Sequence, residues 1–203
     1  MKKNKISKNW VNKQRRDIYV RKSKIEGFRS RAVYKLKEIN EKFKIIKNSM
    51  SVVDLGAAPG SWSQFVMGKF KSIRLVSIDL LDMEKIENSY QIKGDFTDEI
   101  EKKKISDYFG NKIDLVISDM AVNTTGNKNV DSIVTGELSM EALNFAVGIV
   151  KKEGSFVSKI FMGSSFNEIV ANAKSKFKKV SIYKPAASRK DSKESFIICQ
   201  KLK

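Results

Sequence analysis

Apolar and polar residues alternate along this chain in blocks that predict strands and helices in turn. Short runs rich in β-branched residues predict seven strands, at residues 51–56, 74–80, 90–96, 113–120, 154–161, 179–184 and 194–202. Apolar residues at helical spacing predict helices at residues 30–43, 60–70, 97–109, 135–152 and 165–177. Ser30 and Thr97 are the expected N-caps of their helices. The polar residues 121–134 are expected to form a loop.

This order of elements predicts an α/β fold. Strands that alternate with helices form a mostly parallel sheet with helices on both faces. No helical pattern lies between the last two strands, so we expect these two strands to pair antiparallel. Residues 30–203 are expected to form a single domain. Residues 1–29 mix basic and aromatic residues with weak periodicity and are expected to form an N-terminal arm.

Charge changes the picture at the N-terminal end. The net charge is +17, and residues 1–49 hold 17 Lys or Arg residues against four acidic residues. An excess this local predicts an arm that binds a polyanion. Nucleic acid is the favoured interpretation, ahead of an acidic membrane surface or a composition without function. The candidates for phosphate contacts are Arg15, Arg16, Arg21, Lys22, Lys24, Arg29 and Arg31. Trp10 and Tyr19 are candidates for stacking on bases or for packing on the domain.

Missing residue types exclude several kinds of chemistry. The chain has no histidine, which excludes Ser-His-Asp and Cys-His catalysis and histidine-based metal sites. A general base must therefore be Lys, Asp, Glu or Tyr, and we expect no metal. The single cysteine, Cys199, excludes an intrachain disulfide and is expected to be a buried thiol. We expect no membrane span, no secretion signal and a cytoplasmic location.

The segment VVDLGAAPGSW, residues 52–62, joins a predicted strand to a predicted helix. It lacks the lysine and the spacing of a GxxxxGK[ST] phosphate loop, and it lacks the GxGxxG pattern of dinucleotide sites. Pro59 removes a backbone N–H that a phosphate cradle would use, whereas Gly56 and Gly60 allow a ligand to approach the backbone closely. The loop is therefore suited to a ligand other than a phosphate.

Acidic residues follow the ends of four predicted strands, at Asp54, Asp79, Asp95 and Asp119. Ligands of such sheets bind beyond the carboxyl ends of the strands, so we expect an electronegative crevice there. S-adenosylmethionine fits this charge, because it joins a ribose diol to a sulfonium and an ammonium group. A dinucleotide and a structural turn remain alternatives. Asp54 is interpreted as a residue that shapes the loop.

Four motifs together carry a resemblance to a known family. DLGAAPGSWSQ (54–64), GDF (94–96), SDMA (118–121) and RSRAVYKLKEI (29–39) resemble the FtsJ/RrmJ family of RNA ribose 2′-O-methyltransferases over nearly the whole chain. NWVNKQRRDIYV also resembles the arm of the bacterial members. The resemblance implies a Rossmann-like methyltransferase fold, with a seven-stranded, mostly parallel sheet and an antiparallel last strand.

The resemblance also implies the residues of the site. The family's catalytic tetrad matches Lys35, Asp119, Lys159 and Glu194. The implied contacts with S-adenosylmethionine are Gly56, Ala57, Pro59, Gly60, Trp62, Asp79, Asp95, Phe96 and Asp119. Trp62 has a second interpretation as a core residue. The chain departs from the family at Ser61, where a second glycine is usual, and at Val122, where proline is usual.

Methyl transfer from a sulfonium requires alignment and a ribose hydroxyl made nucleophilic. The resemblance implies that Lys159 accepts the proton, for which its pKa must fall from the usual value of about 10.4. A neighbouring Lys35 would lower one of the two lysine pKa values. The alternative is that Lys159 stays protonated and stabilises the alkoxide. Asp119 would position Lys159 and the methyl donor, while Lys35 and Glu194 orient the ribose.

The family acts on several RNAs. The arm and the short chain favour a uridine of large-subunit (23S) ribosomal RNA, modified by a monomer during ribosome maturation. A tRNA methyltransferase is the first alternative. A non-catalytic RNA-binding assembly factor on the same fold and a nicotinamide-dependent oxidoreductase are the others.

Overall fold

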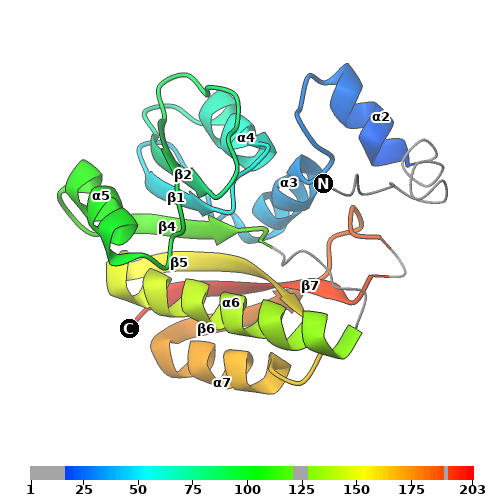
Figure 1. The fold of residues 1–203 in the computed structure, drawn as a ribbon, viewed down its shortest axis with the longest axis vertical. Helices are drawn as coiled ribbons and strands as arrows, with labels where there is room; N and C mark the ends of the chain where they lie inside the picture. The colour runs from blue at the N-terminus through cyan, green and yellow to red at the C-terminus, as the bar shows by residue number, and fades with distance from the viewer. Residues whose placement is uncertain (1–16, 121–127, 190–191) are drawn as a thin grey trace, which may run out of the picture.

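The computed structural model of the protein describes residues 17–120, 128–189 and 192–203. These residues contain one seven-stranded sheet with the strand order β3-β2-β1-β4-β5-β7-β6 (Figure 1). Its strands are β1 (Ser51–Leu55), β2 (Arg74–Asp79), β3 (Tyr90–Lys93), β4 (Ile113–Ser118), β5 (Val150–Phe161), β6 (Phe177–Tyr183) and β7 (Glu194–Leu202). β7 runs antiparallel to both of its neighbours, and the other pairs are parallel. The predicted fold class is confirmed.

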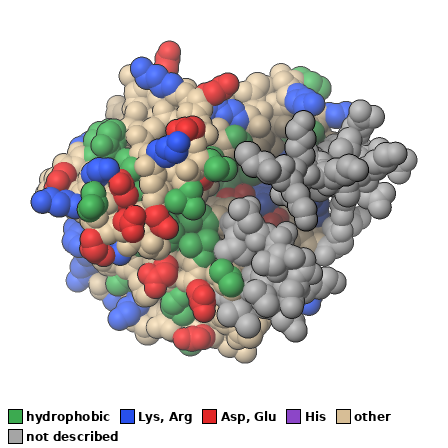
Figure 2. Space-filling model, in the orientation of Figure 1, with side chains coloured by type: hydrophobic (Ala, Val, Ile, Leu, Met, Phe, Trp, Pro, Cys, Tyr) green, Lys and Arg blue, Asp and Glu red, His purple; other side chains and the backbone are tan. Residues whose placement is uncertain are grey.

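Helices cover both faces of this sheet. They are α2 (Ile18–Ile25), α3 (Val33–Phe43), α4 (Ser61–Lys69), α5 (Glu99–Phe109), α6 (Lys128–Ile149) and α7 (Phe166–Lys176). α5, α6 and α7 contribute to the core on one face, and α3 and α4 to the core on the other (Figure 1). On the view of Figure 2, charged side chains lie over the outer surfaces of α5 and α6. Among the described helices, none has the length and apolarity needed to cross a membrane.

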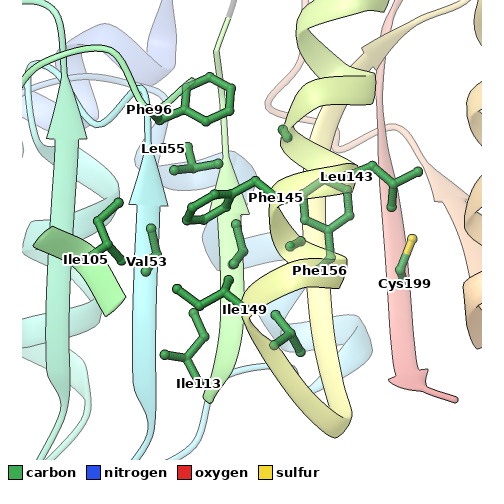
Figure 3. Close-up of a cluster of buried hydrophobic side chains, with 14 of the residues drawn as sticks. Val53, Leu55, Phe96, Ile105, Ile113, Leu143, Phe145, Ile149, Phe156 and Cys199 are labelled. Atoms are coloured by element: carbon green, nitrogen blue, oxygen red, sulfur yellow. The ribbon is translucent and has the colours of Figure 1, made fainter. Parts of the chain in front are cut away.

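The two cores arise from the alternation of side chains along each strand. Val53 and Leu55 of β1 face α5 and α6, where Phe145 and Ile149 pack against them (Figure 3). Val52, the neighbour of Val53, belongs to the opposite core with Leu36 of α3. Because both faces of the sheet are buried, the strands read as continuous apolar runs. This packing fixes the carboxyl ends of β1, β2 and β4 side by side.

Cys199 lies in the first of these cores and is fully buried (Figure 3). Burial raises the pKa of its thiol, so the group stays neutral. The prediction of a buried structural thiol is confirmed.

The predicted bounds of one helix are wrong. Residues 128–134 were expected in a loop but belong to α6, and residues 121–127 lie outside the described part of the chain. The start of α6 holds the polar residues Lys128, Asn129, Asp131 and Ser132, so the sequence shows no apolar period there. At Gly136 a Cβ atom would lie 2.5 Å from Ser165 Oγ, so the helix approaches the start of α7 closely there. α6 also ends at Ile149, and residues 150–152 belong to β5.

Both predicted N-caps are wrong. α5 begins at Glu99 after Asp98, and the Thr97 N–H and hydroxyl both donate to Asp95 Oδ1, at 2.9 and 2.8 Å. α3 begins at Val33, two residues later than a cap at Ser30 requires. Ser30 Oγ accepts the Ala32 N–H at 3.3 Å instead. In both cases a local turn precedes the helix, and the side chain that was expected to cap the helix forms a hydrogen bond within that turn.

Candidate active site

Four ionisable residues from distant parts of the chain meet beyond the carboxyl edge of the sheet. Lys35 comes from α3, Asp119 directly follows β4, Lys159 lies near the end of β5 and Glu194 begins β7. Lys35 Nζ lies 3.3 Å from both Asp119 carboxylate oxygens and 3.1 Å from Glu194 Oε1. Lys159 Nζ lies 3.1 Å from Asp119 Oδ1. The structure thus joins all four residues of the predicted tetrad in one chain of ion pairs.

Charge within this tetrad is balanced around Asp119. Burial alone would raise the pKa of the Asp119 carboxyl, but Lys159 and Lys35 outweigh burial and lower it. Burial would likewise lower the pKa of Lys35, but Asp119 and Glu194 outweigh burial and raise it. Lys35 and Asp119 are therefore both ionised near neutral pH. The two lysines meet as expected, but both contact the Asp119 carboxylate, and the pKa of Lys35 is raised and not lowered.

Lys159 is the most buried member of the tetrad, with a side chain only 7% exposed. Its side-chain nitrogen Nζ donates to the backbone carbonyl oxygen of Asp119 at 2.7 Å. Ser139 of α6 donates a hydrogen bond to the Lys159 carbonyl oxygen at 3.1 Å, which ties β5 to the helix at this point. Both ends of Lys159 are thus held, so its amine has a defined position.

The glycine loop after β1 is tied to the end of β2. The Ala57 N–H donates to the Ile78 carbonyl at 3.1 Å, and the Ala58 N–H donates to Asp79 Oδ2 at 2.9 Å. Gly56 and Gly60 adopt positive φ values of 68° and 101°. A Cβ atom on Gly56 would lie 2.1 Å from Met120 Cγ, so only glycine admits this approach. The loop and Asp79 thus form one rigid unit beside Asp119.

Asp54 lies beneath this unit. Its carboxylate accepts a hydrogen bond from Ser63 Oγ at 2.6 Å, and Ser63 Oγ lies 2.7 Å from Ser77 Oγ. Burial raises the pKa of Asp54 to about 7, and the nearby carboxylates of Asp119 and Asp79 add to the rise. Its position agrees with the interpretation of Asp54 as a residue that shapes the loop.

A cavity of about 430 Å³ opens beside the tetrad. Lys35 and Glu194 line it from the tetrad, and its other lining residues are Ser30, Arg31, Ala32, Arg189 and Ser192. Arg189 and Ser192 were not predicted from the sequence, because the segment between β6 and β7 carries no regular pattern and no motif points to it.

Comparison with known proteins places this site in a family. A family model described as FtsJ-like methyltransferase matches residues 28–202, which include all four tetrad residues. The chain belongs to the FtsJ-like methyltransferase family. The resemblance inferred from the motifs is therefore confirmed, and methyl transfer is the activity of the family to which the chain belongs.

Several FtsJ-like relatives are similar over nearly the whole chain. The Ribosomal RNA large subunit methyltransferase E of Pelagibacter ubique is 64% identical over 203 residues, which cover 100% of both chains. The protein of the same name from Rickettsia akari is 44% identical over 198 residues, 95% of this chain and 87% of that protein. A structure described as a ribosomal RNA methyltransferase from Plasmodium falciparum matches with a TM-score of 0.78 and 28% identity, covering 86% of this chain and 98% of that one.

The two aromatic residues predicted at the cofactor of this FtsJ-like chain have buried rings. Phe96 packs edge-on against Phe145 in the core, with ring centroids 6.1 Å apart (Figure 3). Trp62 donates its indole N–H to the Ala32 carbonyl at 2.8 Å, and its ring lies 5.9 Å from that of Phe196. Lys35 Nζ lies 5.6 Å from the same Phe196 ring. Trp62 therefore supports the tetrad through packing, and a contact of either ring with a cofactor stays a prediction.

The other predicted cofactor residues stay at the loop and the strand ends. Asp79 Oδ1 accepts a hydrogen bond from the Leu81 N–H at 2.8 Å. Asp95 Oδ1 accepts the hydrogen bonds from Thr97 that are described above. The Pro59 carbonyl accepts a hydrogen bond from Arg29 Nη1 at 3.1 Å. Each of these carboxylates keeps acceptor capacity, since a carboxylate oxygen carries two lone pairs.

Ser61, the departure from the family's glycine pair, has a defined partner. Its side chain is buried at the first position of α4, and its hydroxyl lies 2.7 Å from the Ser30 hydroxyl. The serine thus links the glycine loop to the segment before α3. Val122, the second departure, lies outside the described residues.

The predicted RNA-binding set divides into two groups. Arg29 donates to the carbonyl oxygens of Pro59, Glu84 and Lys85, so it braces the glycine loop. Arg31 pairs with Asp17 and donates to the Ala187 carbonyl.

The second group is exposed on α2 and comprises Arg21, Lys22 and Lys24. α2 is held to α3 by an ion pair of 2.7 Å between Lys37 and Glu26 and by the neighbouring rings of Tyr19 and Tyr34. Arg15, Arg16 and Trp10 lie outside the described residues.

Proposed function

We propose that this protein transfers a methyl group from S-adenosylmethionine to a ribose 2′-hydroxyl of large-subunit ribosomal RNA, at a uridine. The observation that carries the proposal is the continuous ion-paired cluster of Lys35, Asp119, Lys159 and Glu194. The relatives named Ribosomal RNA large subunit methyltransferase E support the substrate class. All four residues come from one chain, which supports a monomer, and we propose that it acts in the cytoplasm during ribosome maturation.

The loop and the strand ends fit a methyl donor of positive charge. The pKa of Asp54 is raised by burial and further by the carboxylates of Asp119 and Asp79, so the three acids lie close together at the strand ends. Such a cluster of acids favours a cationic nucleoside over a pyrophosphate. When bound, S-adenosylmethionine supplies a methyl group on a sulfonium. Asp79 would hold its ribose hydroxyls, and the other residues proposed to hold it are Gly56, Ala57, Pro59, Gly60, Asp95 and Asp119, with Trp62 and Phe96 completing the predicted set.

Lys159 is suited to accept the proton of the ribose hydroxyl. A neutral lysine amine has two N–H donors and one lone pair. Lys159 Nζ has two acceptors on Asp119, the backbone carbonyl at 2.7 Å and Oδ1 at 3.1 Å. Two N–H groups directed to these acceptors leave the lone pair for the substrate hydroxyl. Asp119 would therefore orient the base through both its backbone and its side chain.

Lys35 and Glu194 are suited to position the ribose. Lys35 stays a cation, because Asp119 and Glu194 raise its pKa against the effect of burial. The pair presents one donor and one acceptor to the cavity beside Lys159. A ribose hydroxyl is both a donor and an acceptor, so this pair can bind it in one orientation.

The test is methyl transfer into large ribosomal subunits purified from cells that lack the gene. With radiolabelled S-adenosylmethionine, Lys159→Ala is expected to lower kcat by about 10²–10⁴-fold, because the proton acceptor is lost. The Kd for S-adenosylmethionine should stay near that of the wild type. Lys152→Ala, an exposed lysine of the same strand, is the matched control and should keep full activity. A rise of kcat with pH that disappears in Lys159→Ala would support the base.

The same experiment separates the alternatives. Equal incorporation by the wild type and Lys159→Ala would overturn the catalytic role, and RNA binding without incorporation would favour an assembly factor. Label in tRNA rather than in ribosomal RNA would favour the tRNA reaction, and mapping of ribose methylation would identify the nucleotide. Thermal-shift measurements that show stronger binding of NAD than of S-adenosylmethionine would favour an oxidoreductase.

A further inference from the structure

The cavity beside the tetrad has a basic wall that the chemistry of methyl transfer does not use. Its volume of about 430 Å³ lies in the range that holds small ligands. Lys35 and Glu194 line one end. The guanidinium-bearing residues Arg31 and Arg189 line it as well, and no step proposed above involves either arginine.

A carboxylate from outside the cavity lies between these two arginines. Asp17 Oδ2 pairs with Arg31 Nη1 and lies 3.8 Å from Arg189 Nε. The Asp17 side chain is 11% exposed, against 15% for Arg31 and 31% for Arg189. Asp17 also accepts the Tyr19 N–H at 3.0 Å and so caps α2. The arm is thus fastened to the cavity wall by one carboxylate shared by two guanidinium groups.

The two arginines are fixed relative to the tetrad. Glu38 of α3 accepts the backbone N–H groups of Ala186 and Ala187, at 2.6 and 2.9 Å. Arg31 donates to the Ala187 carbonyl. The segment that carries Arg189 is therefore tied to the helix that carries Lys35, so the guanidinium groups are preorganised for a ligand.

We propose that this cavity binds a nucleoside 5′-monophosphate unit, the acceptor nucleotide of the RNA, with its phosphate held between Arg31 and Arg189. The planar guanidinium forks bind carboxylate and phosphate oxygens in the same geometry, so the phosphate takes the place of the Asp17 carboxylate. Asp17 is then an internal competitor that keeps the arginines in position until RNA arrives. This inference rests on the proposed function, because the ribose of the unit would lie at Lys35 and Glu194.

The direct test is binding of uridine 5′-monophosphate to the full chain, measured by calorimetry. Arg189→Ala is expected to weaken binding by about tenfold or more, since a hydrogen bond to a charged group is lost. Arg189→Lys keeps the charge without the fork and should bind with intermediate affinity. Asp17→Asn should bind several-fold more tightly, because asparagine still caps α2 but no longer competes. Uridine, which lacks the phosphate, should bind all of these proteins equally weakly.

Arg74→Ala is the matched control. Arg74 begins β2, at the amino ends of the parallel strands and away from the cavity at their carboxyl ends, and donates to the carbonyl oxygens of Tyr108 and Phe109. Its replacement should leave nucleotide binding unchanged. Equal affinity of Arg189→Ala and the wild type for uridine 5′-monophosphate would overturn the proposal. Unchanged or weaker binding by Asp17→Asn would overturn the role of Asp17 as a competitor.

A kinetic measurement separates this inference from the proposed function. In the methyl-transfer assay, Arg189→Ala should raise the KM for RNA while kcat at saturating RNA and the Kd for S-adenosylmethionine stay near wild-type values. If the wild type methylates no RNA but its nucleotide binding depends on Arg189, the proposed function fails and the cavity assignment holds. If the wild type methylates RNA and Arg189→Ala has an unchanged KM, the cavity assignment fails alone.

Discussion

Two regions of opposite charge meet at Asp119. The donor side, at the ends of β1, β2 and β3, carries Asp54, Asp79 and Asp95. The acceptor side, formed by α3, β5 and the segment before β7, carries Lys35, Lys159 and Arg189. A chain with a net charge of +17 therefore still gathers acidic residues at the carboxyl ends of these strands. The local arrangement of charges within a few ångströms decides what a site binds, because charges farther away are screened.

The two regions also differ in how their charges are held. On the donor side, carboxylates accept hydrogen bonds from backbone N–H groups and serine or threonine hydroxyls, as Asp79 does from Ala58 and Leu81. On the acceptor side, ionised groups hold one another, as Lys35 and Glu194 do. The donor side is therefore a polar framework built into the loops. The acceptor side is a network of ion pairs whose members can exchange partners with a substrate.

The largest effect expected from a substitution in these two regions is a change in the pH dependence of stability, at Asp54. Burial raises its pKa from 3.8 to about 7, so the folded protein binds the proton more tightly than the unfolded chain does. The contribution of Asp54 to stability is therefore full at acidic pH and falls as the pH rises from about 4 to about 7. Asp54→Asn cannot titrate and should lose less stability over this range. Over this pH range, the difference in free energy of unfolding between the wild type and Asp54→Asn should change by at most about 4 kcal/mol.

Urea unfolding at pH 4 and pH 8 measures this change. Asparagine still accepts the hydrogen bond from Ser63, so the variant isolates the charge from the contact. Identical pH dependence of the wild type and Asp54→Asn would show that Asp54 titrates alike in the folded and unfolded chains.

The next largest effect is expected on RNA affinity and tests the basic residues of α2. Replacing Arg21, Lys22 and Lys24 of α2 together by alanine should lower RNA affinity about tenfold or more, because three phosphate contacts are lost. The slope of the logarithm of affinity against that of salt should fall by about 3. Alanine favours helix, so α2 should persist. Filter binding at several salt concentrations provides the measurement.

The matched control is the triple alanine variant of Lys102, Lys103 and Lys104. These lysines lie on α5, far from α2 in Figure 1. An equal loss of affinity in this variant would mean that net charge alone, and not the arm, determines RNA binding.

The smallest effect concerns the link between the two regions. Ser61→Gly restores the glycine usual in the family and removes the hydrogen bond to Ser30. It should lower the free energy of unfolding by about 1 kcal/mol and leave methyl transfer within about twofold of the wild type. Ser30→Ala should give a similar loss, and the double variant should lose little more than either single one. Additive losses would show that the two hydroxyls do not act as a pair.

The sheet and the tetrad could be predicted from the sequence, for different physical reasons. The central strands are buried on both faces and leave continuous apolar runs, so they were visible without tertiary information, whereas the edge strands β3 and β6 carry exposed residues and show less regular patterns. The tetrad was visible because it lies in motifs that resemble those of a known family. α6 was placed too late, since its first residues, among them Lys128, Asn129, Asp131 and Ser132, are polar and show no apolar period. The cavity residue Arg189 carried no signal, because only the pairing of β7 with β5 brings its segment to α3.

The position of β7 has a consequence for how the protein matures during its synthesis. β7 leaves the ribosome after the other six strands of this sheet, yet it lies between β5 and β6 and supplies Glu194. A nascent chain that has emerged only as far as α7 contains the glycine loop and Asp79 but lacks Glu194. The crevice for the donor can therefore form before the place for the acceptor does. If Glu194 positions the ribose as proposed, methyl transfer requires the inserted β7, and a chain that ends before β7 is expected to be inactive on RNA.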